Sequence, residues 1–469
     1  MSKANRYEPT WDSLTSYSVP EWFKDAKFGV FIHWGVYAVP AFNNEWYPRF
    51  MYRDEVSRRG PNFYRYHLEH YGHPSEFGYK DFIPMFKGEK WDPVAWVDLF
   101  KAAGARYVVP VAEHHDGFAM YGSAYTKWNA LNMGPHRDVI AELEGVVRKA
   151  GLKFGVSTHR AFNWRFYRYA PDFDTSDEEY AGLYNPVHAE DAPASEAFLE
   201  DWYARTKELV DRFQPDVLWF DFGWHQDEFA PYRPRITAYY YNKAIDWGSE
   251  VVLQYKDKFP DGVAVYDIER GKLDDIRKEY WQTDTSVSTR SWCYIEDDEF
   301  KSVTTLVHDL VDIVSKNGNL LLNVGPRPDG TIPDEAAERL LGIGEWLKVN
   351  GEAIYGTRYW TIYGEGETTV GTGHMSERES KPFTAGDIRF TTKGDALYAV
   401  CLGWPGDQAI IKSLGSNSAV RAEGISRISM LGVEGSLFWS QDEEGLKIKT
   451  PSEKPCLHAY TFKIVLNGN

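Results

Sequence analysis

Between residues 27 and 351 the chain alternates short apolar runs, rich in β-branched residues, with longer amphipathic stretches. Continuous apolar runs are typical of strands in a parallel sheet that is covered on its outer face, and apolar positions spaced three and four apart predict helices. The predicted strands cover residues 27–35, 106–115, 153–160, 216–223, 250–255, 262–269, 279–286 and 319–326. The predicted helices cover residues 94–105, 137–151, 195–213, 235–248, 301–318 and 334–351.

Eight strands alternating with helices predict a (β/α)8 (TIM) barrel, a fold of about 250 residues that grows with insertions. The surplus length falls in two loops, 36–90 and 161–194, on the side where barrel active sites lie. Near residue 358 short alternating strands separated by Gly, Asp and Pro begin, typical of an antiparallel β-sandwich. The predicted α/β organisation is therefore a (β/α)8-like catalytic barrel over 1–357 and a C-terminal β-sandwich domain over 358–469.

Composition narrows the class of partner. The net charge of −17 argues against nucleic acid and anionic membranes as partners. The chain has 18 Trp, 30 Tyr and 26 Phe, and flat rings of this kind often stack on sugars. Three cysteines are too few and too scattered for a disulfide framework or a zinc site. No apolar leader or membrane-spanning run is visible, so we expect a soluble chain, cytoplasmic as given, or periplasmic or secreted if a leader was removed.

Polar side chains collect where the predicted strands end, which is where barrel enzymes carry their chemistry. They are His33, Trp34, Glu113, His114, His115, Asp116, Ser157, Thr158, His159, Asp221, Asp267 and Glu269. Asp221 lies inside the apolar segment VLWFDFGWH, where an unpaired carboxylate would be costly. No helix starts directly behind it, which weakens a capping role. We therefore interpret Asp221 as a functional group.

Three chemistries could use these residues. Metal-assisted hydrolysis would take its ligands from His33, His114 or His115, and Asp221. However, the first strand offers one histidine where barrel metallohydrolases usually have two, and a tandem pair on a strand points its rings to opposite faces. Nucleophilic acyl transfer lacks a Ser or Cys on a Gly-x-Ser-x-Gly turn. Glycoside hydrolysis by two carboxylates fits the set best.

In a glycosidase, Asp221 would face the anomeric carbon, with Trp219, Phe222 and Trp224 excluding water around it. Nearby histidines would provide the positive field that keeps this carboxylate charged. Glu269, two barrel strands onward, suits the acid that protonates the departing oxygen. The alternative role for Glu269 is an ion pair with its neighbour Arg270.

Five segments, KFGVFIHWG, NEWY, HHDGF, VLWFDFGW and SKNGNLLLNVGPRPDGTIP, occur in the order typical of one enzyme family. With them the chain resembles, over most of its length, the α-L-fucosidases of glycoside hydrolase family 29. The resemblance implies a barrel followed by a β-sandwich, and removal of terminal α-L-fucosyl residues with retention through a covalent fucosyl-enzyme. It implies a fucosylated oligosaccharide or glycoconjugate as substrate, and neither a metal nor an organic cofactor.

The resemblance also implies roles for single residues. Asp221 matches the nucleophile, and Glu269 is our choice for the acid/base, with Asp284 and Glu296 as alternatives. The predicted sugar-binding residues are His33, His114 and His115 as donors to hydroxyls, Glu45 as a hydroxyl acceptor, Trp46 and Trp219 as rings beside the sugar, and Trp292 near the methyl group on C5.

Two departures from the family pattern bear on specificity. Glu113 stands where the family commonly has Lys, and GVSTHR replaces GVYYS, so a tyrosine of the sugar site is absent. We expect His159 or a residue of the 161–194 loop to fill that space. The linkage, a tolerance for α-L-galactosides and the oligomeric state stay open, as does a catalytically silent sugar-binding protein on the same scaffold.

Overall fold

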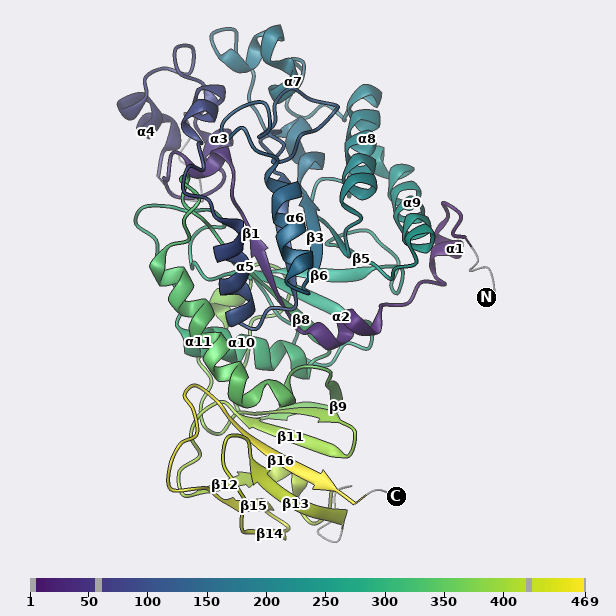
Figure 1. Ribbon diagram of the computed structural model, residues 1–469, viewed down its shortest axis with the longest axis vertical. Helices are drawn as coiled ribbons and strands as arrows, with labels where there is room; N and C mark the ends of the chain where they lie inside the picture. Colours follow the sequence, from purple (N-terminus) through teal and green to yellow (C-terminus); the bar gives the residue numbers. More distant parts are fainter. Residues whose placement is uncertain (1–5, 55–60, 419–423, 468–469) are drawn as a thin grey trace.

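The computed structural model describes residues 6–54, 61–418 and 424–467. Within them, eight parallel strands close into a barrel in the order in which they occur along the chain (Figure 1). Their bounds are β1 (Phe28–Ile32), β2 (Tyr107–Glu113), β3 (Lys153–Thr158), β4 (Val217–Phe220), β5 (Val252–Tyr255), β6 (Val265–Glu269), β7 (Trp281–Ser286) and β8 (Gly318–Val324). Each coincides with a predicted strand, so the predicted (β/α)8 barrel is confirmed.

The predicted helices surround the barrel. They are α5 (Pro93–Ala102), α6 (Val139–Lys149), α8 (Glu196–Phe213), α9 (Tyr232–Trp247), α10 (Val303–Ser315) and α11 (Asp334–Asn350). Shorter helices are α1 (Trp11–Leu14), α2 (Glu21–Ala26), α3 (Tyr47–Phe50), α4 (Phe63–His70) and α7 (Ala181–Tyr184). Several helices begin at a side chain that accepts a first-turn backbone N–H, as Asp92 does for α5 and Ser302 does for α10.

Alternating strand residues divide the barrel into an inner and an outer apolar layer. Phe31, Trp219 and Leu321 belong to one buried cluster, whereas their neighbours in sequence pack with residues of the surrounding helices. This alternation follows from the period of two along a strand. The inner cluster forms the floor beneath the carboxyl ends of the strands.

The two long loops lie over one end of the barrel. The 36–90 loop contains α3 and α4, and the 161–194 loop contains α7. Figure 1 shows these three helices at the top of the molecule, at the opposite end from the C-terminal sheets. Because the loops follow β1 and β3, they cover the end at which a barrel active site is expected.

The C-terminal region consists of two antiparallel sheets, with strand orders β13-β16-β11-β10-β9 and β12-β15-β14. The strands are β9 (Arg358–Glu365), β10 (Ile388–Lys393), β11 (Ala396–Cys401), β12 (Gln408–Ile411), β13 (Ile425–Met430), β14 (Trp439–Asp442), β15 (Gly445–Lys449) and β16 (Tyr460–Leu466). The predicted β-sandwich is therefore confirmed, whereas the domain boundary at residue 358 stays a prediction.

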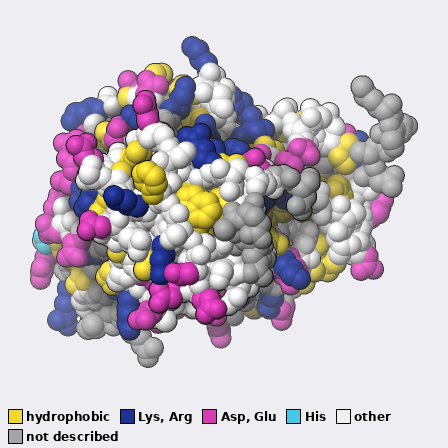
Figure 2. All heavy atoms as spheres, turned by 90° about the horizontal axis from the view of Figure 1, so that it is seen from below, with side chains coloured by type: hydrophobic (Ala, Val, Ile, Leu, Met, Phe, Trp, Pro, Cys, Tyr) yellow, Lys and Arg dark blue, Asp and Glu magenta, His cyan; other side chains and the backbone are white. Residues whose placement is uncertain are grey.

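The surface seen from below the view of Figure 1 mixes charges of both signs (Figure 2). Acidic and basic side chains are interspersed there, and the hydrophobic ones form small separate groups. Among the described helices, none has the length and the apolar run that crossing a bilayer requires.

Candidate active site

Asp221 directly follows β4, at the carboxyl end of the barrel, and its side chain is 9% exposed. Two residues on, Gly223 has a φ of 107°, and a Cβ there would lie 2.8 Å from the backbone nitrogen of Phe162. This turn therefore needs glycine for its backbone conformation and for its close approach to the loop after β3. The tight turn keeps Asp221 at the mouth of the barrel.

Three side chains hold the Asp221 carboxylate. His115 Nε2 lies 3.1 Å and His159 Nδ1 lies 3.0 Å from Oδ2. Lys256 Nζ lies 3.1 Å from Oδ1. The carboxylate therefore cannot rotate without breaking several contacts, as a preorganised nucleophile requires.

The charge that stabilises Asp221 comes mainly from Lys256. Although burial opposes ionisation, Lys256 and the two histidines hold the pKa of Asp221 well below its usual range. Burial lowers the pKa of His159 to about 4, and lowers that of His33 and His114 as well. The expected contribution of histidines to keeping Asp221 charged comes from His115 and His159, and Lys256 adds to it.

Lys256 connects the two predicted catalytic carboxylates. It follows β5, is 4% exposed, and lies 2.8 Å from Glu269 Oε2. Since the same nitrogen is 3.1 Å from Asp221 Oδ1, these two oxygens can be no more than about 5.9 Å apart. Retaining glycosidases keep their carboxyl groups about 5–5.5 Å apart and inverting ones about 6.5–9.5 Å. The separation favours retention.

Glu269 lies at the end of β6 with 22% of its side chain exposed. Its alternative role, an ion pair with Arg270, is not observed, because the Arg270 guanidinium donates to Glu377 at 2.7 Å. Glu269 lines a cavity at the barrel mouth, so solvent and substrate can reach it.

The two other acid/base candidates have different surroundings. Asp284 is 1% exposed beneath the site, and burial together with Asp267 raises its pKa well above the usual range. Its Oδ2 lies 3.7 Å from Lys256 Nζ, yet it does not line the cavity that Glu269 lines. Glu296 is exposed. Besides burial, its negative charge helps to raise the pKa of Tyr66 and of Tyr71. Access to the cavity favours Glu269.

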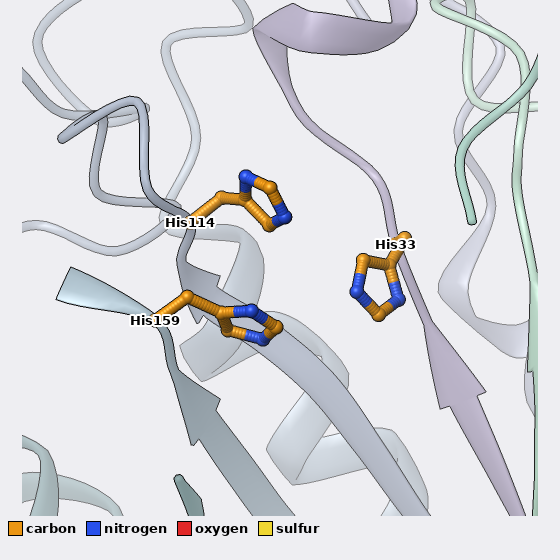
Figure 3. Close-up of side chains that lie close together, drawn as sticks. All are labelled: His33, His114 and His159. Atoms are coloured by element: carbon orange, nitrogen blue, oxygen red, sulfur yellow. The ribbon is translucent and has the colours of Figure 1, made fainter. Parts of the chain in front are cut away.

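The rings of His33, His114 and His159 come from the ends of β1, β2 and β3 and lie close together (Figure 3). The Nδ1 atom of His33 lies 2.7 Å from the side-chain oxygen of Asn323 on β8, which leaves its Nε2 for a ligand. His114 Nδ1 has no hydrogen-bond partner among the described residues. These two rings can therefore contact sugar hydroxyls.

His115 and His159 serve Asp221 instead. His115 Nδ1 donates to the carbonyl of His159 at 2.7 Å, and His159 Nε2 lies 3.0 Å from Ser157 Oγ, so both nitrogens of each ring are engaged. Because β2 ends at Glu113, strand alternation no longer applies to the His114–His115 pair, and both rings reach the site. The expectation that they point to opposite faces was wrong.

Two groups of side chains could hold a metal ion. They are His33, His114 and His159, and His115, His159 and Asp221, with the possible ligand atoms of each group within 4.8 Å of one another. Either group includes His159, whose nitrogens already contact Asp221 and Ser157. A metal would have to displace one of these contacts.

A cavity of about 530 Å³ opens beside Glu269 and Phe222, the latter next to Asp221 in the chain. Its lining includes the predicted sugar-binding residues Glu45, Trp46 and Trp292. Burial raises the pKa of Glu45, whose Oε2 accepts the Trp292 backbone N–H at 3.0 Å. The Trp46 and Phe222 rings are nearly parallel, at 14° with centroids 6.0 Å apart. Trp219 lies beneath, with Lys256 Nζ 4.9 Å from its ring centroid.

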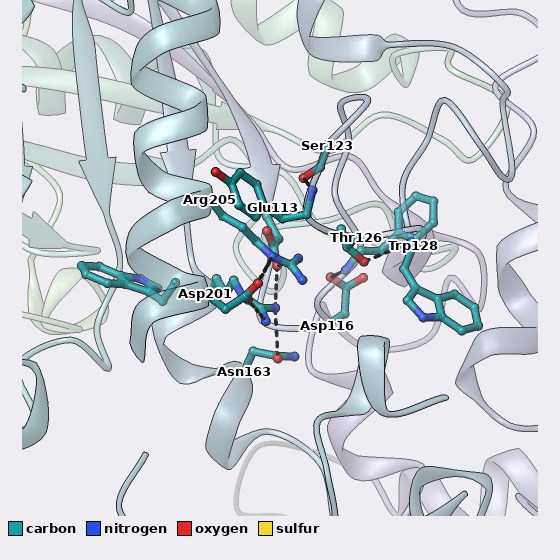
Figure 4. Close-up of polar contacts among 12 residues, drawn as sticks. Glu113, Asp116, Ser123, Thr126, Trp128, Asn163, Asp201 and Arg205 are labelled. Carbon is teal, nitrogen blue, oxygen red and sulfur yellow. Dashed lines mark hydrogen bonds and ion pairs between the residues drawn. The ribbon is translucent and has the colours of Figure 1, made fainter. Parts of the chain in front are cut away.

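Two residues near the site have structural roles. Trp224, expected around the nucleophile, is 1% exposed and stacks on Phe220 with centroids 3.9 Å apart, in the layer outside the barrel. Glu113 is buried between Arg160 and Arg205, at 2.9 and 3.2 Å. Figure 4 shows Glu113 beside Arg205. Glu113 thus neutralises buried arginines, which explains why an acid rather than a lysine fits there.

Lys256 and the segment around His374 and Met375 were not predicted from the sequence. Lys256 lies in the polar run YKDK, which resembles an exposed turn. Met375 N–H donates to the Glu269 carbonyl at 2.7 Å although more than a hundred residues separate them, and no periodicity indicates this contact.

A barrel with two carboxylates across one ammonium, beside a cavity lined by aromatic rings, is the site of a retaining glycoside hydrolase. The sequence model described as "Alpha-L-fucosidase" matches residues 1–352, and that of the α-L-fucosidase C-terminal domain matches 381–465. The chain belongs to the α-L-fucosidase family.

Known α-L-fucosidases are similar to this chain over nearly its whole length. Tissue α-L-fucosidase of Rattus norvegicus is 34% identical over 96% of this chain and 90% of its own length, and that of Homo sapiens is 34% identical over 98% and 92%. The crystal structure of Thermotoga maritima α-fucosidase covers 98% of this chain and 100% of its own, at 33% identity and a TM-score of 0.79. The resemblance drawn from the sequence is thereby confirmed.

Proposed function

We propose that this α-L-fucosidase releases terminal fucose by double displacement, with Asp221 as nucleophile and Glu269 as acid/base. Asp221 attacks the anomeric carbon while Glu269 protonates the departing oxygen. Glu269 then deprotonates a water that opens the covalent fucosyl-enzyme, with net retention. The observation that carries the proposal is the pair of carboxylate oxygens no more than about 5.9 Å apart across Lys256.

Substrate contacts follow from which ring nitrogens are engaged. We propose that His33 and His114 contact fucose hydroxyls, that Glu45 accepts one, and that Trp46 and Trp292 line the ring. His115 and His159 act through Asp221 because their nitrogens are already engaged. Fucosylated glycans, as oligosaccharides or glycoconjugates, are the proposed substrates. We further propose that the catalytic domain ends near residue 357.

Hydrolysis of an aryl α-L-fucoside, followed by NMR, tests the proposal. α-L-Fucose as the first product supports it, and β-L-fucose contradicts it. Parallel assays with α-L-galactoside and β-D-galactoside measure how strictly fucose is selected. Binding of fucose without turnover would instead identify a catalytically silent sugar-binding protein.

A further inference from the structure

A segment of the C-terminal region forms one wall of the active site. Residues 372–377, between β9 and β10, run along the chain that continues from β6. Backbone N–H groups of Gly373, Met375 and Glu377 donate to the carbonyls of Lys272, Glu269 and Arg270, at 2.9, 2.7 and 2.9 Å. The segment falls between the two ranges that the family models match.

Past this wall a second cavity adjoins the active-site cavity. The second cavity measures about 540 Å³ and shares Thr289, Glu377 and Arg378 with the first. Its far side is formed by the beginning of α10 and by residues 380–383, including Pro382 and Phe383. A glycan whose fucose occupies the first cavity can extend into the second.

The second cavity is basic, in a chain whose net charge is −17. Its charged lining residues are the cations Lys272, Lys301, Arg378 and Lys381 and the acids Asp309 and Glu377. The two acids are already paired, Asp309 with Lys272, and Glu377 with Lys301 and Arg270. Arg378 donates to the Thr289 carbonyl at 3.1 Å, and neither it nor Lys381 forms an ion pair with a described residue.

From this geometry we propose that the second cavity is a subsite for an acidic sugar of the aglycone, carrying a sulfate or carboxylate oxyanion. The guanidinium of Arg378 and the ammonium of Lys381 contact the oxyanion, and the positive end of α10 adds to the field. The apolar Pro382 and Phe383 accommodate the sugar ring. This subsite rests on the proposed fucosidase function and names the class of its substrate.

The test compares kcat/KM for three fucosylated oligosaccharides that differ only in the aglycone sugar: neutral, sulfated or carboxylated. The wild type is expected to favour at least one acidic substrate by about tenfold in kcat/KM, because that substrate makes one charge-assisted contact that the neutral substrate lacks. The variant R378Q/K381Q is expected to lose that preference. The control R427Q/K454Q removes the same charge from the β-sandwich and keeps the preference.

Equal kcat/KM for all three substrates, or a preference that survives R378Q/K381Q, overturns the subsite. The preference is the ratio of kcat/KM for an acidic substrate to kcat/KM for the neutral one, so a loss of activity that affects all substrates equally does not change it. Failure to hydrolyse even the aryl α-L-fucoside would contradict the fucosidase proposal instead, which keeps the two outcomes distinct. Which of the two acidic substrates is favoured identifies the oxyanion.

A separate observation concerns His374. Its Nδ1 accepts the backbone N–H of Glu269 at 3.0 Å, and its Nε2 lies 2.9 Å from the Tyr266 hydroxyl. Together with the Met375 bond to the Glu269 carbonyl, both peptide groups of the acid/base are tied to this segment. We infer that His374 is a positioning residue for Glu269.

Proton donation accelerates the reaction most when the leaving group is poor. A misplaced Glu269 should therefore slow a disaccharide more than an activated aryl fucoside, whereas a general structural defect should slow both equally. We expect H374A to lower kcat about tenfold on a fucosyl disaccharide and much less on an activated aryl fucoside, and H374N, which keeps an acceptor, to restore the disaccharide rate. His458, which contacts Thr304 of α10, provides the control H458A. Equal losses on both substrates, or no recovery in H374N, overturn the inference.

Discussion

The two carboxylates of the site are held in different ways. Asp221 is 9% exposed and contacts His115, His159 and Lys256, all from the ends of barrel strands. Glu269 is 22% exposed, shares Lys256, and has its backbone tied to residues 374 and 375 of the C-terminal region. The proposed nucleophile is held by the barrel alone, whereas the proposed acid/base depends on the packing of two distant segments.

This difference matches the demands of the reaction. The nucleophile must meet the same anomeric carbon in every substrate, so a rigid and buried setting suits it. The acid must reach the leaving oxygen of different aglycones, so a position on the wall of the cavity suits it. We therefore expect changes near Asp221 to affect all substrates alike, and changes near Glu269 to depend on the leaving group.

The largest effect is expected for D221A. Removing the nucleophile should lower kcat by about 10⁴-fold or more on every substrate, because no covalent intermediate can form. Added azide should restore turnover and yield a glycosyl azide, detectable by mass spectrometry. Substantial residual activity without azide would contradict the role of Asp221.

Next comes E269A. On a fucosyl disaccharide kcat should fall by about 10²–10⁴-fold, since the leaving oxygen departs without a proton. On an aryl fucoside with an acidic phenol the first step should be nearly unaffected, so a burst of phenol precedes slow turnover. A uniform loss on both substrates would argue for Asp284 or Glu296 instead, and D284A and E296A are the matched comparisons.

K256M should lower kcat/KM by about 10²-fold, typical for one charge-stabilising group. Lys256 depresses the pKa of Asp221, so its loss lets the carboxylate protonate at a higher pH. The acidic limb of the pH profile of kcat/KM should therefore move upward, and K256R should keep it low. If the acidic limb does not move in K256M, His115 and His159 are sufficient to keep the pKa of Asp221 low.

Glu113, a buried carboxylate outside the active site, is expected to affect the stability of the fold rather than catalysis. Arg160 and Arg205 share two acids, Glu113 and Asp201, and E113A removes the fully buried one, which should lower the free energy of unfolding by about 1–3 kcal/mol. The exposed pair of Glu338 with Arg339 is the control, and E338A should cost less than about 1 kcal/mol. Denaturant unfolding measures the change in the free energy of unfolding for both variants. Equally small changes would contradict the structural role of Glu113.

The smallest effect is expected from metal removal. Because the His159 nitrogens already contact Asp221 and Ser157, incubation with a chelator should leave kcat unchanged. Loss of activity that added zinc restores would assign one of the two histidine groups to a metal. Metal analysis of the purified protein provides an independent check.

Local pattern was sufficient for the barrel. Strands buried on both faces must be continuously apolar, so runs such as YVVPVAE and NLLLNV were visible in the sequence. The same reasoning located Asp221, because a carboxylate within such a run is costly without a purpose. Lys256 was not predictable in this way, since a lysine after a strand usually lies in solvent. The misplacement of Trp224 shows that residues beyond a strand end no longer alternate reliably.

By itself the sequence determined the order of strands and helices, the β-sandwich that follows them, and the carboxylates at the strand ends, because these depend on local periodicity and on fixed barrel topology. Only the tertiary structure decided which histidines contact Asp221, that Lys256 lies between it and Glu269, and that residues 372–377 form one wall of the cavity. Closing the barrel and packing the C-terminal region against it bring these groups together, and contacts between residues far apart in the chain leave no periodic signal.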